Sequence, residues 1–163
     1  VPIVIDADGV YALSERREAR AGLRYEHAVI TPHPGEFARL AGEKPGGSTR
    51  ERIDAVGRYT GAERVVTVLK GHHTVIAGPD DGPHVNLTGN RGMATAGAGD
   101  VLTGVIGALL AQGLRPYEAG VAGAWLHGCA GDCAAGERGI DGVTSRDIVD
   151  SRPAAFRYVR ASA

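Results

Sequence analysis

The sequence predicts an α/β fold, with a single domain over residues 1–163 built on a mostly parallel sheet flanked by helices. Short apolar runs alternate along the chain with longer helical stretches, and the order strand, helix, strand favours parallel pairing. Each apolar run stops at polar or turn-forming residues. A chain of 163 residues with 43% hydrophobic content is long enough for one sizeable core and too short for two.

The first two predicted strands lie in the amino-terminal part of the chain. Residues 2–6 (Pro-Ile-Val-Ile-Asp) form an apolar run that is typical of a strand buried on both faces. After Gly9 we expect a helix to about Ala21, and then a second strand over His27–Thr31. This strand closes at three turn formers, Pro32, Pro34 and Gly35.

A capped helix precedes the third predicted strand. Ser48 and Glu51 have the spacing of a capping box, which predicts a helix that begins there and runs toward Tyr59. The apolar run Arg64–Leu69 is typical of a third buried strand, and the pair Lys70–Gly71 ends it abruptly.

A hairpin, a loop and a helix follow in the middle of the chain. His73–Gly78 and Pro83–Thr88 flank an Asp-Asp-Gly turn, which indicates a β-hairpin appended to the sheet. Thr88–Gly99 is a polar, glycine-rich loop. The pattern then becomes helical near Val101 and stays helical until Gly113, a natural carboxyl-terminal cap.

Two more helices complete the predicted fold. Pro116 suits the first position of a helix, which we expect to run to about Gly136. Thr144 fits the N-cap of the last helix, in which Pro153 would introduce a kink or a restart. The earlier apolar run Val101–Leu114 is shorter than the roughly 20 residues that span a bilayer, so we expect a buried helix there.

The charge pattern favours no macromolecular partner. The formal net charge is −1, and nothing in the sequence indicates binding to nucleic acid or to a membrane surface. No charged-then-apolar leader precedes the first strand, so we expect a cytoplasmic protein. In residues 15–26 arginines are interleaved with glutamates, a pattern that is typical of a solvated helix face. The residues are Arg16, Arg17, Arg20 and Arg24 with Glu15, Glu18 and Glu26.

The two cysteines, Cys129 and Cys133, are spaced so that they share one face of a helix. We interpret them as small buried thiols. A disulfide within one helical turn is geometrically awkward, and a metal site would need further ligands, for which only His127 is near in the sequence.

The glycine-rich segment Gly92–Asp100 leads directly into an apolar helix and is the strongest functional signal. Unpaired N–H groups at a helix amino terminus carry partial positive charge, and glycines let a phosphate approach the backbone, so this junction suits an anion. Asp100 is placed to take a proton from an attacking hydroxyl. The alternative is that Asp100 only caps the helix and the glycines form a tight turn. No Gly-Lys-Ser/Thr follows, which excludes a Walker-type phosphate loop.

The segment Lys70–Thr74 ends a buried strand at the position where open α/β sheets bind ligands. Its paired histidines, His72 and His73, suggest a metal site. Adjacent histidines on an extended chain point to opposite sides, however, so we rank a structural or nucleotide-contacting role above metal binding.

Two further segments at strand ends carry ionisable groups. Two prolines stiffen the turn over residues 31–36, which presents His33 and Glu36, and such a loop is commonly functional. The alternative is a helix start, because Glu36 would be favourable in a first turn. Asp6 and Asp8 either hold a cation through water or begin a turn.

Four separated stretches together form a specific pattern: Asp6–Val10, Thr31–Glu36, Lys70–Thr74 and Gly89–Gly104. They resemble the signature segments of the NAD(P)H-hydrate dehydratase family, in the family's order. Gly97-Ala-Gly-Asp100 alone resembles the wider ribokinase superfamily, whereas Thr-Pro-His-Pro-Gly-Glu, Gly-Met-Ala-Thr and Gly-Asp-Val-Leu-Thr-Gly narrow the resemblance to the dehydratases. The resemblance extends over nearly the whole chain.

This resemblance implies a ribokinase-like fold and a lyase that uses ADP, or ATP in some members, to convert the S epimer of hydrated NADH or NADPH to the reduced cofactor. Phosphorylation of the C6 hydroxyl on the hydrated nicotinamide would precede elimination of phosphate. Asp100 would activate that hydroxyl, and the Gly97 to Gly99 amides would stabilise charge on the phosphoryl group. Mg²⁺ would accompany the nucleotide.

The same resemblance implies the ligand contacts. The hydrated cofactor would contact His33, Glu36 and Asp100. The nucleotide would contact Lys70, Gly71, His72, His73, Thr74, Asn90, Gly92, Met93, Ala94, Thr95, Gly97, Ala98 and Gly99. A homo-oligomer and a functional coupling to an NAD(P)HX epimerase are family expectations. We expect no nucleic-acid partner, no membrane partner and no metal site made by protein side chains.

Two features depart from the family pattern. Arg91 stands where the family usually has proline, which would loosen the loop or add a phosphate contact. The family domain also starts well before Val1, so we expect further residues normally to precede it and this chain to form the carboxyl-terminal portion of the domain. Two alternatives stay open, a ribokinase-like kinase acting on a hydroxymethyl pyrimidine or a sugar, and a non-catalytic nucleotide-binding module.

Overall fold

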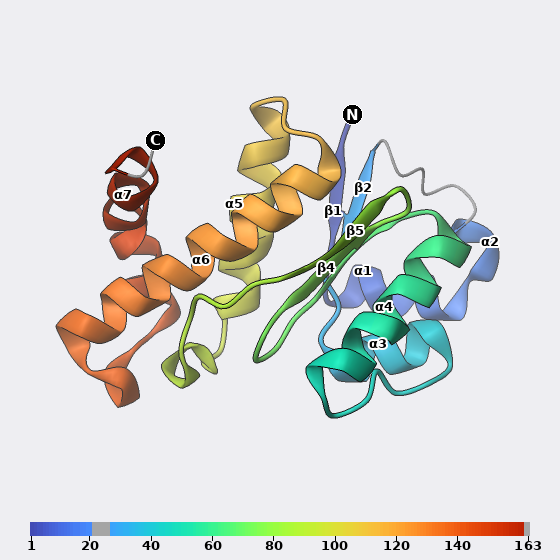
Figure 1. Ribbon diagram of the computed structural model, residues 1–163, viewed down its shortest axis with the longest axis horizontal. Helices are drawn as coiled ribbons and strands as arrows, with labels where there is room; N and C mark the ends of the chain where they lie inside the picture. Colours follow the sequence, from blue (N-terminus) through green and yellow to red (C-terminus); the bar gives the residue numbers. More distant parts are fainter. Residues whose placement is uncertain (21–26, 162–163) are drawn as a thin grey trace.

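A five-stranded sheet lies at the centre of the protein, in a computed structural model that describes residues 1–20 and 27–161 (Figure 1). Its strands follow one another across the sheet in chain order: β1 (Ile3–Ile5), β2 (Ala28–Ile30), β3 (Val66–Leu69), β4 (Val75–Gly78) and β5 (Asp81–Val85). β1, β2 and β3 pair in parallel, whereas β4 is antiparallel to both of its neighbours. β5 therefore points in the same direction as the first three strands, which confirms a mostly parallel sheet.

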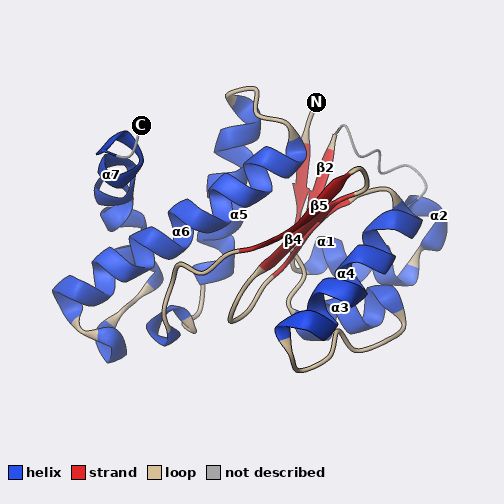
Figure 2. Cartoon of the chain, in the orientation of Figure 1, coloured by secondary structure: helices blue, strands red, loops and turns tan. Residues whose placement is uncertain are grey.

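Helices lie on both sides of the sheet and give the molecule three layers (Figure 2). One side carries α1 (Asp8–Glu15), α2 (Arg17–Arg20), α3 (Pro34–Ala41) and α4 (Thr49–Glu63). The other carries α5 (Ala98–Ala111), α6 (Pro116–Arg138) and α7 (Ser145–Ala161), with the 3₁₀ helices η1 (Arg91–Met93) and η2 (Ile140–Gly142). In the described ranges no helix combines the length and the apolar character that crossing a membrane requires.

Two apolar cores form because successive residues of a strand point to opposite faces of the sheet. On β3, Val66 and Val68 pack toward α5 and α6, whereas Leu69 packs toward the helices of the other side. There Phe37 of α3 meets Tyr59 of α4 edge to face, with ring centroids 5.4 Å apart. β2, β3 and β4 are thus held from both sides, which fixes the positions of their ends.

The first strand differs from its prediction. In the described part of the chain β1 lies at an edge of the sheet, where Ile3 is 48% exposed and Val4 and Ile5 are half-buried. The prediction that this strand is buried on both faces is wrong, because an apolar run does not reveal which place in the sheet a strand takes.

Boundaries differ in three further places. The helix expected up to Ala21 is two helices that meet at Arg16, and Ala21 itself lies outside the described residues. The hairpin turns at Pro79–Asp80, so that Asp81 already belongs to β5 and the Asp-Asp-Gly turn is not formed. α7 continues through Pro153 without a restart.

Arg20 does not belong to a solvated helix face, as its charge pattern suggested. Its side chain is 6% exposed, and its guanidinium donates to the carbonyls of Leu13, Leu40 and Ser14 at 2.8, 2.9 and 3.2 Å. The expectation fails because a pattern of alternating charges says nothing about buried carbonyls that need donors. Arg24 and Glu26, also part of that pattern, lie outside the described residues.

Small residues let α6 approach its neighbours closely. A Cβ atom added at Gly123 would lie 2.6 Å from Cγ1 of Ile106 on α5, and one at Gly128 would lie 2.2 Å from Oγ1 of Thr88. Any side chain at these two positions would clash. Cys129 and Cys133 are free thiols on the same helix, and burial raises the pKa of Cys129.

His127, on α6, contacts the start of α5 with a partly buried ring. The ring forms a hydrogen bond with the backbone of Ala98, while its Nε2 atom is buried without a partner in the described part of the chain. Desolvation lowers the pKa of His127 to about 4, against a smaller opposing effect of the bond to Ala98. The ring is therefore neutral at pH 7 in the folded protein.

We predict that His127 makes the protein less stable in acid. His127 binds a proton with a pKa near 6.5 in the unfolded state, but only near pH 4 in the folded state. Acid therefore favours the unfolded state: the folded protein has its full stability above pH 6.5 and loses stability as the pH falls toward 4. The loss between pH 7 and 4 amounts to up to about 3 kcal/mol, at about 1.4 kcal/mol for each pKa unit. Urea unfolding at the two pH values should show that His127→Gln loses less free energy of unfolding between pH 7 and 4 than the unchanged protein.

The control for this prediction is His27→Gln, which changes an exposed histidine and should lose as much stability in acid as the unchanged protein. If all three proteins lose the same free energy of unfolding between pH 7 and 4, the prediction is contradicted.

Candidate active site

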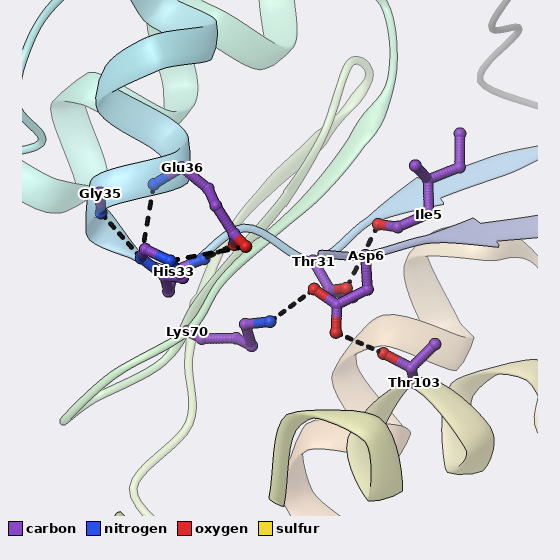
Figure 3. A network of polar contacts seen from close by, with 8 residues as sticks. All are labelled: Ile5, Asp6, Thr31, His33, Gly35, Glu36, Lys70 and Thr103. Atoms are coloured by element: carbon purple, nitrogen blue, oxygen red, sulfur yellow. Dashed lines mark hydrogen bonds and ion pairs between the residues drawn. The ribbon is translucent and has the colours of Figure 1, made fainter. Parts of the chain in front are cut away.

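Three polar side chains follow the ends of the three parallel strands and meet at one edge of the sheet (Figure 3). Asp6 follows β1, Thr31 follows β2 and Lys70 follows β3. The Lys70 ammonium donates to Asp6 Oδ1 at 2.5 Å, and the Thr31 hydroxyl donates to the carbonyl of Ile5 at 3.3 Å. This edge, where open α/β sheets bind ligands, therefore carries a polar cluster already assembled.

The Asp6 carboxylate is the centre of the cluster, because Thr103 of α5 donates to its second oxygen at 2.8 Å. Burial by itself would raise the pKa of Asp6, but hydrogen bonds from Lys70 and Thr103, with the charge of Lys70, outweigh burial and lower the pKa. Asp6 is therefore ionised at neutral pH. The cation that it holds is the Lys70 ammonium, whereas Asp8 begins α1.

The amino terminus of α5 lies beside this ion pair. Its N-cap, Gly97, has a φ of 83°. In the described part of the chain no N-cap side chain accepts a hydrogen bond from the first-turn amides of this helix. A Cβ atom at Gly99 would lie 3.4 Å from Lys70 Nζ and 3.7 Å from Asp6 Oδ2. Helix dipole, amides and ammonium together favour an anion at this place.

Asp100 lies in the first turn of α5 and is exposed to solvent. The helix begins at Ala98 rather than near Val101, with Gly97 as its N-cap, so the alternative in which Asp100 caps the helix is wrong. A Cβ atom at Gly97 would lie 3.1 Å from Ser145 Oγ and 4.0 Å from Asp100 Oδ2. The carboxylate is thus accessible next to the cap of the helix.

The loop Lys70–Thr74 turns sharply after β3. Gly71 has a φ of 137° and His73 a φ of 54°, and the Thr74 hydroxyl closes the turn by donating to the Gly71 carbonyl at 3.1 Å. The expectation that His72 and His73 point to opposite sides is wrong. Because the segment is not extended, their ring centroids lie only 3.9 Å apart, with an interplanar angle of 36°.

His33 and Glu36 form the capping box of α3. His33 Nδ1 accepts from the amides of Gly35 and Glu36 at 2.9 and 3.4 Å, and Glu36 Oε2 accepts from the His33 amide at 2.7 Å. The helix start that was the alternative interpretation of this turn is confirmed. An accepting Nδ1 assigns the ring proton to Nε2, on a side chain that is 56% exposed.

The glycine-rich loop is anchored to α6 through Asn90. This side chain caps η1 by accepting from the Gly92 amide at 3.0 Å, and its Nδ2 donates to Asp132 at 2.9 Å. Asp132 also accepts from the Gly89 amide at 2.8 Å. The loop therefore has a fixed path before it enters α5.

The end of the same loop packs against α6 and then reaches α5. A Cβ atom at Gly131 would lie 2.2 Å from Met93 Sδ, so the methionine fills the space that this glycine leaves. Ala94 and Thr95 lie in the connection to α5, and the Thr95 carbonyl accepts from the Ala98 amide at 3.3 Å.

Two groups stand out among the predicted site residues, whereas His33 and Glu36 cap α3 and the segment His72–Thr74 forms the turn after β3. Lys70, Gly97 and Gly99 meet at one place, on which α5 and β3 converge. Arg91, the departure from the family pattern, forms an ion pair with Asp141 at 3.6 Å, and both side chains are exposed. The second group anchors the loop to α6 and consists of Asn90, Gly92 and Met93.

Sequence reasoning missed three residues that shape this site. Thr103 lies four residues after Gly99 and therefore on the same helix face, a spacing that could have identified it. Ser145, at the start of α7, and Asp132, on α6, come from distant segments, and no local pattern in the sequence marks them.

Comparisons with known proteins point to one family. A sequence model of that family, described as NAD(P)H-hydrate dehydratase, matches residues 1–154. The bifunctional NAD(P)H-hydrate repair enzyme Nnr of Moorella thermoacetica is 45% identical over 159 residues, which cover 96% of this chain and 29% of that protein. The ADP-dependent (S)-NAD(P)H-hydrate dehydratase of Neisseria meningitidis serogroup B is 46% identical over 140 residues, which cover 85% of this chain and 47% of that protein.

Solved structures share the fold. The ADP/ATP-dependent NAD(P)H-hydrate dehydratase of Bacillus subtilis, co-crystallised with ATP and Mg²⁺, has a TM-score of 0.80 at 32% identity, over 96% of this chain and 56% of that chain. A ribokinase-like superfamily protein of Enterococcus faecalis V583 has a TM-score of 0.73 at 28% identity, over 96% and 53%. The ribokinase-like fold is confirmed. The chain spans less than half the length of the two curated relatives. From the match over 1–154 and these identities, the chain belongs to the NAD(P)H-hydrate dehydratase family.

Proposed function

We propose that this chain carries the nucleotide-dependent dehydration of NAD(P)H hydrate, in which the S epimer is converted to NADH or NADPH at the expense of ADP or ATP. The observation that carries the proposal is the convergence of the Lys70–Asp6 ion pair with the Gly97–Gly99 turn of α5. A cation, the amides of Gly97 and Gly99 and a helix dipole at one point form a site for a phosphoryl group.

In this mechanism Asp100 is the general base. It would take the proton from the C6 hydroxyl of the hydrated nicotinamide while that oxygen attacks the terminal phosphorus of the nucleotide. The amides of Gly97 and Gly99, with the Lys70 ammonium, would stabilise the charge on the phosphoryl oxygens. The leaving group of this step is the nucleotide without its terminal phosphoryl group. Phosphate would then leave C6 while C5 loses a proton to solvent, which restores the ring double bond. The exposure of Asp100 supports this role, because the carboxylate is free to meet a substrate.

The ligand contacts are proposed as follows. The hydrated cofactor meets Asp100 and, at the neighbouring strand end, His33 and Glu36. The nucleotide lies along the two loops that reach the sheet edge, and its contacts are Lys70, Gly71, His72, His73, Thr74, Asn90, Gly92, Met93, Ala94, Thr95, Gly97, Ala98 and Gly99. For Asn90, Gly92 and Met93 the observed anchoring to α6 supports an indirect contribution, through the path of the loop.

ADP or ATP as co-substrate is supported by the named relatives, one called ADP-dependent and one crystallised with ATP and Mg²⁺. The described residues contain no group of three or more His, Cys, Asp or Glu side chains that could hold a metal ion, and both Asp6 oxygens already accept hydrogen bonds. Mg²⁺ would therefore arrive with the nucleotide phosphates, as this ion commonly does, and would neutralise their charge.

The proposal also covers the partner activity, the location and the oligomeric state. The relative in Moorella thermoacetica is named a bifunctional repair enzyme, which supports a functional coupling of this activity to an NAD(P)HX epimerase. A cytoplasmic location is also proposed, and a homo-oligomer is proposed as the family expectation.

The first prediction from the proposed function is that absorbance in the NADH band rises when the protein is mixed with hydrated NADH, Mg²⁺ and ADP or ATP, with release of inorganic phosphate. Omitting the nucleotide should abolish the rise. A stable phosphorylated substrate without phosphate release would indicate a kinase instead, and nucleotide binding without turnover would indicate a non-catalytic module.

The second prediction concerns Asp100→Asn, which should lower kcat at least about 100-fold, the usual contribution of a general base, while the Kd for ADP changes little. Turnover and calorimetric ADP binding measure the two effects. Asp54→Asn, on the exposed face of α4, is the matched control and should leave both unchanged. Unchanged turnover in Asp100→Asn would exclude the mechanism.

The third prediction concerns Gly99→Ala, whose methyl group would occupy the approach to Lys70 without a serious clash. We expect ADP affinity to fall about tenfold, the equivalent of one charge-assisted hydrogen bond. Gly104→Ala is the matched control on α5, because its Cβ would meet nothing within 4 Å. Both variants should be at least as stable as the unchanged chain, since alanine favours the helix. Equal ADP affinity in the two variants would argue against the anion site.

A further inference from the structure

Arg52, on α4, is a buried arginine for which the proposed mechanism has no role. Its side chain is 8% exposed. The guanidinium reaches the end of β3, where Nη2 donates to the carbonyls of Leu69 and Lys70 at 3.2 and 3.1 Å and Nη1 donates to the carbonyl of His72. One side chain from the helix layer thus holds three carbonyls of the segment that leads into the candidate nucleotide loop.

The backbone of this segment explains why it needs an outside donor. Gly71 and His73 both have positive φ values, 137° and 54°, so the chain leaves the strand direction directly after the carbonyls of Leu69 and Lys70. Buried carbonyls without donors are costly, and the planar fork of arginine can serve several at once. A lysine at this position would offer one ammonium in place of two separated nitrogen donors.

Close packing reinforces these hydrogen bonds. A Cβ atom at Gly71 would lie 3.1 Å from Arg52 Nη2, so the loop passes close to the guanidinium. A second contact from the same helix turn joins Thr49 Oγ1 to His73 Nδ1 at 3.2 Å. The first turn of α4 is itself fixed by the Ser48–Glu51 capping box.

Lys70 connects this scaffold to the candidate active site. Its carbonyl accepts from Arg52, while its ammonium, at the other end of the same residue, donates to Asp6 beside α5. A displacement of the Lys70 backbone would therefore move the ammonium relative to the Gly97–Gly99 amides.

We propose that Arg52 is a positioning residue that sets the conformation of the loop Lys70–Thr74 and thereby the affinity of the site for the nucleotide, an inference that rests on the proposed function. Arg52 touches neither ligand in this account. It acts through the carbonyls that it holds, so its loss changes nucleotide binding and leaves the rest of the fold in place.

The experiment compares Arg52→Lys and Arg52→Met with the unchanged chain and with Arg50→Met. Arg50 lies on the same helix with an 85% exposed side chain, so its replacement is a matched control. Hydrogen exchange of the amides over residues 71–74 reports the loop without any ligand, and calorimetry with ADP reports the site. Where turnover is measurable, KM for ADP and kcat are separated.

We expect exchange over residues 71–74 to become at least about tenfold faster in Arg52→Met, with the sheet amides unchanged, because only the local opening free energy falls. The Kd and KM for ADP should rise about tenfold while kcat per folded molecule is retained, with a smaller rise in Arg52→Lys. Arg50→Met should behave as the unchanged chain. If Arg52→Met does not fold, Arg52→Lys decides the same comparison.

Two outcomes would overturn the inference. In the first, a folded Arg52 variant keeps both the exchange rates of the loop and the affinity for ADP. In the second, protection falls across the whole sheet while KM for ADP is unchanged, which would make Arg52 only a stabilising residue. If the unchanged chain binds no ADP, the proposed function fails, and the exchange over residues 71–74 then still decides whether Arg52 sets the loop.

Discussion

The ion pair between Lys70 and Asp6 is the interaction on which the candidate site depends. It joins the ends of β1 and β3 across β2, and Thr103 ties the same carboxylate to α5. The Lys70 ammonium and the amino terminus of α5 are both positive and would repel each other. Because Asp6 accepts from both sides, it offsets this repulsion and the desolvation of the pair, and positive groups remain gathered where an anion can bind.

The topology of the sheet supplies the frame for that interaction. Parallel pairing of β1, β2 and β3 brings their carboxyl ends to one edge, and the β4–β5 hairpin then carries the chain back to α6. There the Thr88 hydroxyl donates to the carbonyl of Trp125 at 3.0 Å, and Asn86 donates to that of Ala124 at 3.2 Å. The glycine-rich loop therefore starts from a fixed point and reaches α5 along a fixed path.

The sequence predicted the regular parts of this structure because their causes are local. The Ser48–Glu51 capping box, the apolar run of β3 and the approach of glycines to a helix amino terminus depend on neighbouring residues. Long-range partners were not predictable. The charges of Arg20 suggested a solvated face, and no pattern showed that its donors meet carbonyls 6 to 20 residues away. The close rings of His72 and His73 depend on a positive φ at His73, a backbone conformation that is uncommon for residues other than glycine.

The candidate anion site lies where the two cores of the protein meet. The loop after β3 is held by α4, which packs in one core, whereas the α5 turn belongs to the other core. Within the described residues, the sheet and the contacts of Asp6 connect the two halves of the site. Since a displacement of about 1 Å can cost about 100-fold in rate, repacking in either core would act on the chemistry through the distance between Lys70 and the Gly99 turn. The strands β2 and β3, which lead to the site, are each held on both faces because their residues pack into both cores.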